Sequence, residues 1–419
     1  MKKLVIAAAM LLSVTVQAQR VNVMEEVAAM PQKSFGTDFP YSFDVPALTP
    51  SPKGYKPFYI SHYARHGSRY YWTKDLYVDI DSMLTQAKRL GTLTEEGKKF
   101  HDAYMEAYPE LMAGMGELTR VGWDQHQGIA RTMYASFPEV FRKGGTVSAI
   151  SSLSGRCVIS MSAFCQALEQ CNPKLDIYEQ SSRFTLHGVV PTDGENPYKK
   201  SYPRKVLRLN PSTIARPAGM PSSEEVVARV FTSTQGLSKR ASAIQSDLKN
   251  LYTSLPSIGH VGMMGNIMTD QEIVASWENS NFYAYQSFYG NQNDMIPIVE
   301  DILDRAKAVV EGESTDLASL RFGHDTCLGP LTILMGINGA DTEISDASDV
   351  KLWYQNYQTG KAANIQFIFY RSKKNPEILV KCLLNGEEAT LPLPGDGTPY
   401  YKWSDFYSYY RNLCDAAGK

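Results

Sequence analysis

The sequence predicts an α/β protein in which a mostly parallel sheet is flanked by helices and carries an inserted, mostly helical cap. Two segments support this prediction, "GTVSAISSLSGRCVISMSAFCQALEQC" and "LASLRFGHDTCLGPLTILMGI", because each is typical of a strand, a turn and a helix in succession. Strands that alternate with helices favour a parallel sheet. Between about 180 and 300 the chain is broken by Pro and Gly and continues in helix-like segments, which indicates the insertion.

The N-terminal segment, residues 1–18, is typical of an export signal. Lys2 and Lys3 precede a short apolar run, and Val16 and Ala18 place small residues at the −3 and −1 positions of a cleavage site. The apolar run is too short to span a bilayer, and no later stretch is long enough. We therefore expect an exported protein, periplasmic or secreted, that is cleaved near Ala18 and has no membrane anchor.

The first elements of the mature chain follow from local composition. Residues 19–55 are rich in Pro, Ser and Thr, and we expect an extended lead-in there. "KPFYISHYA", residues 56–64, is rich in β-forming residues and predicts the first strand. Thr94 and Thr119 each precede a helix-favouring segment, and threonine is a good N-cap. We therefore expect helices that begin at these two threonines.

The later elements complete the predicted sheet. A strand at about 146–152 precedes a helix from about 155, and "LASLRFG" precedes the turn "GHD" and another helix. "NIQFIFYR" and "EILVKCLLNGEEATLPL" predict further strands, with a hairpin turn at Asn385-Gly386. The aromatic segment "SDFYSYYRNLC" predicts a last helix.

The length of the chain allows two domains. About 400 mature residues can bury a large core. From the change in composition we predict one α/β domain made of residues 19–180 and 300–419, with residues 181–299 as the inserted helical cap.

The charge balance excludes a generally cationic protein. The chain has 42 basic and 44 acidic residues, and loss of Lys2 and Lys3 would leave 40 against 44, a net charge of −4. Nucleic-acid binding is therefore not expected, and any preference for anions must be local.

The cysteines leave the disulfide pattern open. There are 6 of them, a low number for a disulfide scaffold. If Cys157 and Cys165 share a helix, they lie about 12 Å apart by helical rise, which is too far for a bridge. Some of the six could equally be free buried thiols.

Polar residues that are unusual for a core stand at three predicted strand-to-loop junctions. They are Arg65, His66, Arg69, Arg156, His324 and Asp325. In open α/β sheets, ligands bind at the carboxyl ends of strands, so one site can collect all three junctions. Guanidinium groups match phosphate oxygens bidentately and remain charged, which makes this set suited to a phosphate monoester.

His66 is the candidate nucleophile of such a site. A neutral imidazole nitrogen can attack phosphorus and form a phosphohistidine. The flanking Arg65 and Arg69 disfavour protonation of the imidazole and stabilise charge on the phosphoryl oxygens. Asp325 is the candidate acid for the leaving alcohol, and it would act as the base for the water that releases phosphate.

These motifs resemble the histidine acid phosphatases, branch two of the histidine phosphatase superfamily. "RHGSR" and "GHDTCLGPL" carry the likeness, and "FPEVF", "RC" with "SAF", and "AANIQFIFY" are most similar to the multiple inositol polyphosphate phosphatase and phytase subgroup. The resemblance covers residues from about 55 to 400. It implies a phosphoglycerate mutase-like α/β domain with a helical cap and no metal or other cofactor.

The resemblance also implies roles for individual residues. His66 would be the nucleophile and Asp325 the proton donor. The phosphate ligands would be Arg65, Arg69, Arg156 and His324.

Two positions depart from the family pattern. Tyr70, Tyr71 and Trp72 follow the first motif where the family often has proline, so the shape of the loop stays open. His324 is followed by Asp325, as in acid phosphatases and many phytases, whereas the inositol polyphosphate subgroup typically has His-Ala-Glu. The positional preference on an inositol ring therefore stays open too.

Other polar residues have two interpretations each. His62 and His66 have the i, i+4 spacing of a zinc pair, but the segment is a predicted strand and lacks the Glu of H-E-x-x-H. Lys74 and Arg183 are candidates for contacts with distal phosphates. The basic residues of the cap form either a solvated face or a rim that attracts a polyanion such as phytate. They are Lys199, Lys200, Arg204, Lys205, Arg208 and Arg216.

The sequence hypothesis is an exported, monomeric acid phosphatase for phosphomonoesters, with inositol polyphosphates such as phytate as the leading substrates. The alternatives are a broad-specificity acid phosphatase for sugar phosphates or nucleotides, a phosphomutase of the same superfamily, and a non-catalytic phosphate-ester binding protein. His66 and Asp325 argue against the binding protein, which needs neither a nucleophile nor an acid.

Overall fold

The computed structural model describes residues 23–395 and 398–417. The predicted export signal, residues 1–18 with its cleavage site near Ala18, lies outside the described residues. Within the described ranges, no helix combines the length and the apolar character needed to cross a membrane.

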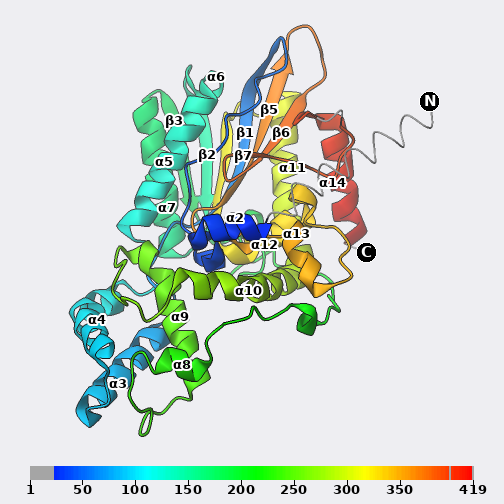
Figure 1. Ribbon diagram of the computed structural model, residues 1–419. Coiled ribbons are helices and arrows are strands. Elements are labelled where there is room, and N and C mark those ends of the chain that lie inside the picture. Colours follow the sequence, from blue (N-terminus) through cyan, green and yellow to red (C-terminus); the bar gives the residue numbers. More distant parts are fainter. Residues whose placement is uncertain (1–22, 396–397, 418–419) are drawn as a thin grey trace.

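One mixed sheet forms the centre of the molecule (Figure 1). Its strands run in the spatial order β3-β2-β4-β1-β5-β6-β7, and β8 pairs with β6. The first four of these are parallel to one another, whereas β5, β6, β7 and β8 join by antiparallel pairing. The bounds are β1 (Tyr55–Arg65), β2 (Gly145–Ser151), β3 (Leu175–Ser181), β4 (Ala318–Gly323), β5 (Asn364–Ser372), β6 (Leu379–Leu384), β7 (Glu387–Ala389) and β8 (Tyr401–Lys402). The predicted α/β class is confirmed.

The register of the parallel strands brings three chain turns to one edge of the sheet. Arg65 at the end of β1 lies opposite Gly323 of β4, and Ser151 of β2 lies opposite Phe322. The loops that follow β1, β2 and β4 therefore leave the sheet side by side, as parallel strands require.

Helices cover both faces of the sheet. In Figure 1, α5, α6 and α7 lie on one side, whereas α11 and α14 lie on the other. Each group encloses its own apolar cluster with the sheet, which leaves the central strands β1 and β4 buried from both faces. The helices of these layers are α5 (Arg120–Ser136), α6 (Pro138–Phe141), α7 (Gly155–Cys171), α11 (Ile296–Glu311), α12 (Asp325–Leu334) and α14 (Trp403–Ala417).

A third apolar cluster lies away from the sheet. It joins helices α3 and α4 to helices α8 and α9, which Figure 1 shows together below the sheet. The bounds are α3 (Lys74–Leu90), α4 (Glu95–Gly114), α8 (Ser223–Val227) and α9 (Ala241–Ile258). Two helices from before residue 115 thus pack with two from the predicted cap. The division into residues 19–180 with 300–419 and a cap of 181–299 stays a prediction.

The remaining elements connect these layers. The long helix α10 (Asp270–Asn291) runs below the sheet in Figure 1. The shorter helices are α13 (Val350–Trp353) and the 3-10 turns η2 (Arg183–Gly188), η3 (Pro211–Thr213), η4 (Gln292–Met295), η5 (Ile337–Gly339), η6 (Ala347–Asp349) and η7 (Asn356–Thr359).

Local signals in the sequence predicted several boundaries. The side chains of Thr94 and Thr119 accept hydrogen bonds from the backbone N–H groups of Gly97 and Gly122, which confirms both N-caps. The predicted hairpin turn joins β6 to β7, and Asn385 has a φ of 55° as a tight hairpin turn requires.

The prediction of an extended lead-in over residues 19–55 is wrong for its first described part. Helix α2 (Val23–Ala29) and the 3-10 segment η1 (Pro31–Asp38) occur there. Val23 and Val27 stand one helical turn apart and pack in one apolar cluster with Trp277 of α10. Tertiary burial of these two valines, rather than a local signal, therefore stabilises the helix.

Candidate active site

The backbone around His66 is fixed by two neighbouring segments. The His66 N–H donates to the carbonyl of Gly323 at 3.0 Å, and the Ala362 N–H donates to the carbonyl of His66, also at 3.0 Å. The Arg65 N–H donates to the carbonyl of Ala363 at 2.8 Å. Strand β1 therefore delivers His66 to a position between the end of β4 and the chain that enters β5.

The loop after His66 packs directly against the start of helix α5. A Cβ atom on Gly67 would lie 2.5 Å from the carbonyl oxygen of Gly122, and one on Gly122 would lie 2.2 Å from the carbonyl oxygen of Ser68. The Gly67 N–H donates to Ser160 Oγ at 3.1 Å, and the Ser68 N–H donates to Gln125 Oε1 at 2.8 Å. Only glycine at both positions permits this close approach.

The ring of His66 is held in one tautomer. Its Nδ1 lies 2.8 Å from the carbonyl oxygen of Gly67, which can only accept a hydrogen bond, so Nδ1 carries the proton and Nε2 has a free lone pair. Burial, and then the charges of Arg65 and Arg69, lower the pKa of His66 well below its usual value. The imidazole is therefore neutral, as a nitrogen nucleophile must be.

Guanidinium groups surround this ring. Arg65 is 1% exposed, and its Nη1 donates to the carbonyls of Thr37 and Thr359, while its Nη2 lies 3.3 Å from Asp325 Oδ2. Arg69 donates to the carbonyl of Tyr70 at 2.9 Å.

Arg156 stands in the first turn of α7, just beyond the loop that follows β2. Within the described residues, the buried Nε atoms of Arg69 and Arg156 have no hydrogen-bond partner. Both guanidinium groups therefore retain donor capacity for an oxyanion.

His324 and Asp325 bring a second imidazole and a carboxylate from β4 and α12. The ring centroids of His324 and His66 are 5.6 Å apart, and His324 Nε2 lies 3.1 Å from Ser152 Oγ. Burial and Arg156 lower the pKa of His324 to about 4. Burial alone would raise the pKa of Asp325, but the nearby cations, with Arg65 first, outweigh it and lower the pKa to about 2.

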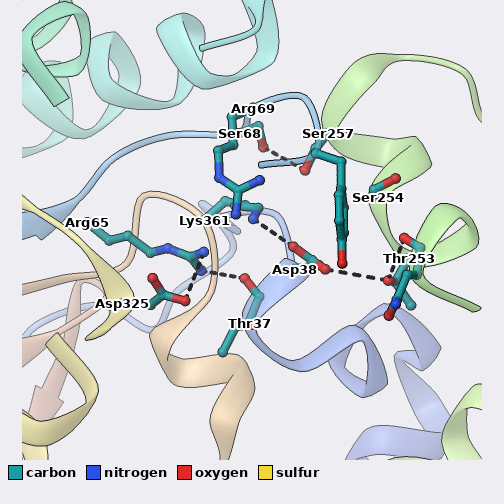
Figure 2. Close-up of polar contacts among 12 residues, drawn as sticks. Thr37, Asp38, Arg65, Ser68, Arg69, Thr253, Ser254, Ser257, Asp325 and Lys361 are labelled. Carbon is teal, nitrogen blue, oxygen red and sulfur yellow. Dashed lines mark hydrogen bonds and ion pairs between the residues drawn. The ribbon is translucent and has the colours of Figure 1, made fainter. Parts of the chain in front are cut away.

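Two further charged groups belong to this cluster, and sequence reasoning missed both. Lys361 is 1% exposed, and its Nζ lies 2.6 Å from Asp38 Oδ1 (Figure 2). Asp38 ends η1, and Lys361 lies two residues beyond the end of η7. Neither residue follows a strand or stands in a recognisable motif, so no local signal marks them.

The structure therefore brings together six of the predicted site residues. They are Arg65, His66, Arg69, Arg156, His324 and Asp325. Lys74 stands exposed at the first position of α3, and Arg183 pairs with Glu195 at 2.5 Å. Contacts of Lys74 and Arg183 with distal phosphates stay a prediction.

The structure also places the other residues weighed from the sequence. His62 lies within β1 and packs against Phe164 and Phe322, in a strand rather than on a helix. Over residues 23–395 and 398–417, no three His, Cys, Asp or Glu side chains are grouped so as to hold a metal ion. All six cysteines are free thiols, and five of them are buried.

Comparison with known proteins identifies the fold. No protein-family model and no curated protein sequence matches the chain. Among solved structures, the multiple inositol polyphosphate phosphatase of Bifidobacterium longum in complex with inositol hexasulfate is 20% identical with a TM-score of 0.66, over 90% of this chain and 97% of that one. The phytase from D. castellii is 15% identical with a TM-score of 0.67, over 93% of this chain and 88% of that one.

A further phytase, from Citrobacter braakii, is 12% identical with a TM-score of 0.53, over 85% of this chain and 98% of that one. At such identities the likeness speaks for the fold. The chain thus has the fold of the histidine acid phosphatases, to which multiple inositol polyphosphate phosphatases and phytases belong, as the resemblance of its motifs implied.

Proposed function

We propose that this protein is an exported phosphatase that hydrolyses phosphomonoesters through a phosphohistidine at His66. The observation that carries the proposal is the environment of that ring: a neutral imidazole, with Nδ1 held by the Gly67 carbonyl, stands among arginines that suit an oxyanion. Nε2 attacks phosphorus, and the bond from phosphorus to the ester oxygen breaks. Arg65, Arg69 and Arg156 stabilise charge on the phosphoryl oxygens.

Asp325 donates a proton in the first step and accepts a proton in the second. Its carboxyl gives a proton to the departing ester oxygen, and its carboxylate then takes one from the water that attacks the phosphohistidine. Water thus restores His66 and releases inorganic phosphate.

In the free protein Asp325 is ionised, because its pKa is about 2. The negative charge of a bound phosphate offsets Arg65 and Lys361, so it raises this pKa towards the mildly acidic range. At a mildly acidic pH the carboxyl therefore takes up a proton as the substrate binds, whereas above pH 6 it stays ionised.

Inositol polyphosphates are the substrate class that we favour. The fold is shared with a structure whose printed title names a complex with inositol hexasulfate, and with phytases. A polyanion also suits a site whose unpartnered donors belong to guanidinium groups. The alternative is a broad-specificity acid phosphatase, which would hydrolyse simple aromatic and sugar phosphates as readily.

Phosphate release from phytate and from p-nitrophenyl phosphate tests the reaction. We expect release by the wild type and none above background by His66→Ala. His260→Ala is the matched control, because His260 is a partly exposed histidine that pairs with Glu110 instead. Equal release by His66→Ala and the wild type would end the phosphohistidine mechanism.

Trapping the intermediate tests the proposal independently. The wild type, incubated with ³²P-labelled substrate and quenched in alkali, should carry label that acid removes, whereas His66→Ala should carry none. Tight binding of phytate by the wild type without label or turnover would instead support the non-catalytic binding protein.

A further inference from the structure

The backbone around Lys361 is hydrogen-bonded to the backbone of His66, the proposed nucleophile. The Lys361 N–H donates to the carbonyl of Phe39 at 2.8 Å, and the next residue, Ala362, donates to the carbonyl of His66 at 3.0 Å. Ala362 has a φ of 58°, in the left-handed region that alanine rarely adopts. Strained backbone of this kind is found where surrounding contacts enforce it, often at functional sites.

The side chain of Lys361 is as deeply buried as those of two central residues of the candidate site. Lys361, Arg65 and His66 are each 1% exposed. The Lys361 ammonium pairs with Asp38 at 2.6 Å, and Figure 2 shows both between Arg65, Arg69 and helix α9. An ammonium at this depth beside two guanidinium groups is unfavourable unless anions balance it, and Asp38 is shared among all three cations.

We propose that Lys361 is a further phosphate ligand of this site, and that Asp38 pairs with it while no substrate is bound. This rests on the proposed function only in taking a phosphoryl oxyanion as the ligand. When the oxyanion binds, the ammonium donates to one of its oxygens and supplies a fourth cation beside Arg65, Arg69 and Arg156. Lys361 then holds a substrate oxygen, whereas a merely structural pair would only join η1 to the segment between η7 and β5.

The protonation of Lys361 gives this role a pH signature. Burial, and then Arg65, lower its pKa to about 7, against the opposing effect of Asp38. The other charged groups that face it do not titrate between pH 6 and 8.5: Arg69 remains a cation, His66 is neutral, and Asp38 and Asp325 are ionised. A bound dianion favours the ammonium form, so binding should weaken as the pH rises above 7.

Sulfate is the probe that tests this inference, because it carries two negative charges across the whole pH range and cannot be hydrolysed. Titration calorimetry at pH 6 and pH 8.5 should show that the wild type binds sulfate on the order of tenfold more weakly at the higher pH. Lys361→Arg keeps a cation at both pH values, so its affinity for sulfate should be the same at pH 6 and at pH 8.5. Lys361→Met should bind weakly at both.

Lys249→Met is the matched control, because Lys249 is a partly buried lysine of α9 that donates to Ser276 and Ser280. It should bind sulfate as the wild type does. Equal affinity and equal pH dependence in wild type and Lys361→Met would overturn the inference, as would failure of the wild type to bind sulfate. If Lys361→Met does not fold, a pH dependence in Lys361→Arg as steep as in the wild type would overturn it instead.

The two proposals can fail separately. Sulfate binding that depends on Lys361, without hydrolysis of either phytate or p-nitrophenyl phosphate, would contradict the phosphatase and leave the ligand role intact. Hydrolysis whose kcat/KM is unchanged in Lys361→Met would contradict the ligand role alone.

Discussion

Two pairs of buried or partly buried histidines lie close to strand β1, and only one pair stands beside the cations and the carboxylate of the candidate site. The site pair is His66 and His324, and the core pair is His62 and His126. His62 precedes His66 by four residues on β1, and both pairs have pKa values below the ordinary value. Burial is the first cause in all four cases.

The difference lies in what surrounds each pair. The site pair faces Arg65, Arg69, Arg156 and the carboxylate of Asp325. The rings of the core pair instead pack against aromatic side chains, with His62 and His126 centred 5.5 Å and 5.6 Å from Phe322.

Hydrogen bonding differs as well. In the described part of the chain, neither ring nitrogen of His62 has a hydrogen-bond partner, whereas Nδ1 of His66 is held by the Gly67 carbonyl. Burial is thus enough to keep an imidazole neutral. In the proposed mechanism, a fixed tautomer, adjacent cations and an acid are what allow His66 to attack a phosphate ester.

Among the changes that compare the two pairs, replacing Asp325, the proposed acid beside the site pair, is expected to lower the rate most. Asp325→Asn keeps the shape of the side chain but cannot donate a proton, so kcat with phytate should fall by about 10²–10⁴-fold. With p-nitrophenyl phosphate the loss should be much smaller, because nitrophenolate departs without a proton. Steady-state kinetics with both substrates measure the two losses, and equal losses would contradict the assignment of Asp325 as the acid.

Residues that follow a strand were the part of the site that sequence could predict. His66 stands just beyond the end of β1, His324 just beyond β4, and Arg156 at the start of the helix after β2. The carboxyl ends of parallel strands meet at one edge, so recognising each strand was enough to place its turn. The N-caps and the hairpin turn were also predictable, because the residues that signal each of them are close together in the sequence.

Lys361 and Asp38 could not be placed in this way. Asp38 belongs to the 3-10 segment η1, which composition predicted to be extended. The preceding helix α2 forms because Val23 and Val27 pack against Trp277. Lys361 reaches the site because the segment beyond it binds the backbone of His66. Both positions depend on contacts between segments far apart in sequence, which no local pattern encodes.

The same substitution in each pair sharpens the contrast. His324→Phe removes a polar group that would contact the phosphoryl oxygens, and kcat/KM for p-nitrophenyl phosphate should fall by about 10²–10³-fold. His126→Phe places a similar ring among aromatic neighbours and should leave kcat/KM within about threefold, since no transition-state contact is lost. Kinetics on both purified variants, each checked for folding by circular dichroism, give the comparison. A comparable loss in the two variants would mean that the core pair takes part in the chemistry.

The smallest expected effect concerns stability rather than rate. Folding lowers the pKa of His126 from 6.5 to about 3, so below pH 6.5 the unfolded chain binds more protons than the native protein. The contribution of neutral His126 to the free energy of unfolding is therefore lost as the pH falls from 6.5 towards 3. Between pH 7 and pH 5 the loss is about 2 kcal/mol.

His126→Phe should remove that loss, because phenylalanine does not titrate and fits an aromatic core. Urea unfolding at pH 7 and pH 5 should show a free energy of unfolding that falls by about 2 kcal/mol less in the variant than in the wild type. Adding sulfate to the wild type should not reduce the acid-induced loss of stability in the way that His126→Phe does. An anion in the candidate active site would contact the site pair, whereas His126 lies among aromatic rings. If the variant loses stability on acidification as steeply as the wild type, then His126 is protonated in the native protein, and burial alone does not keep the core pair neutral.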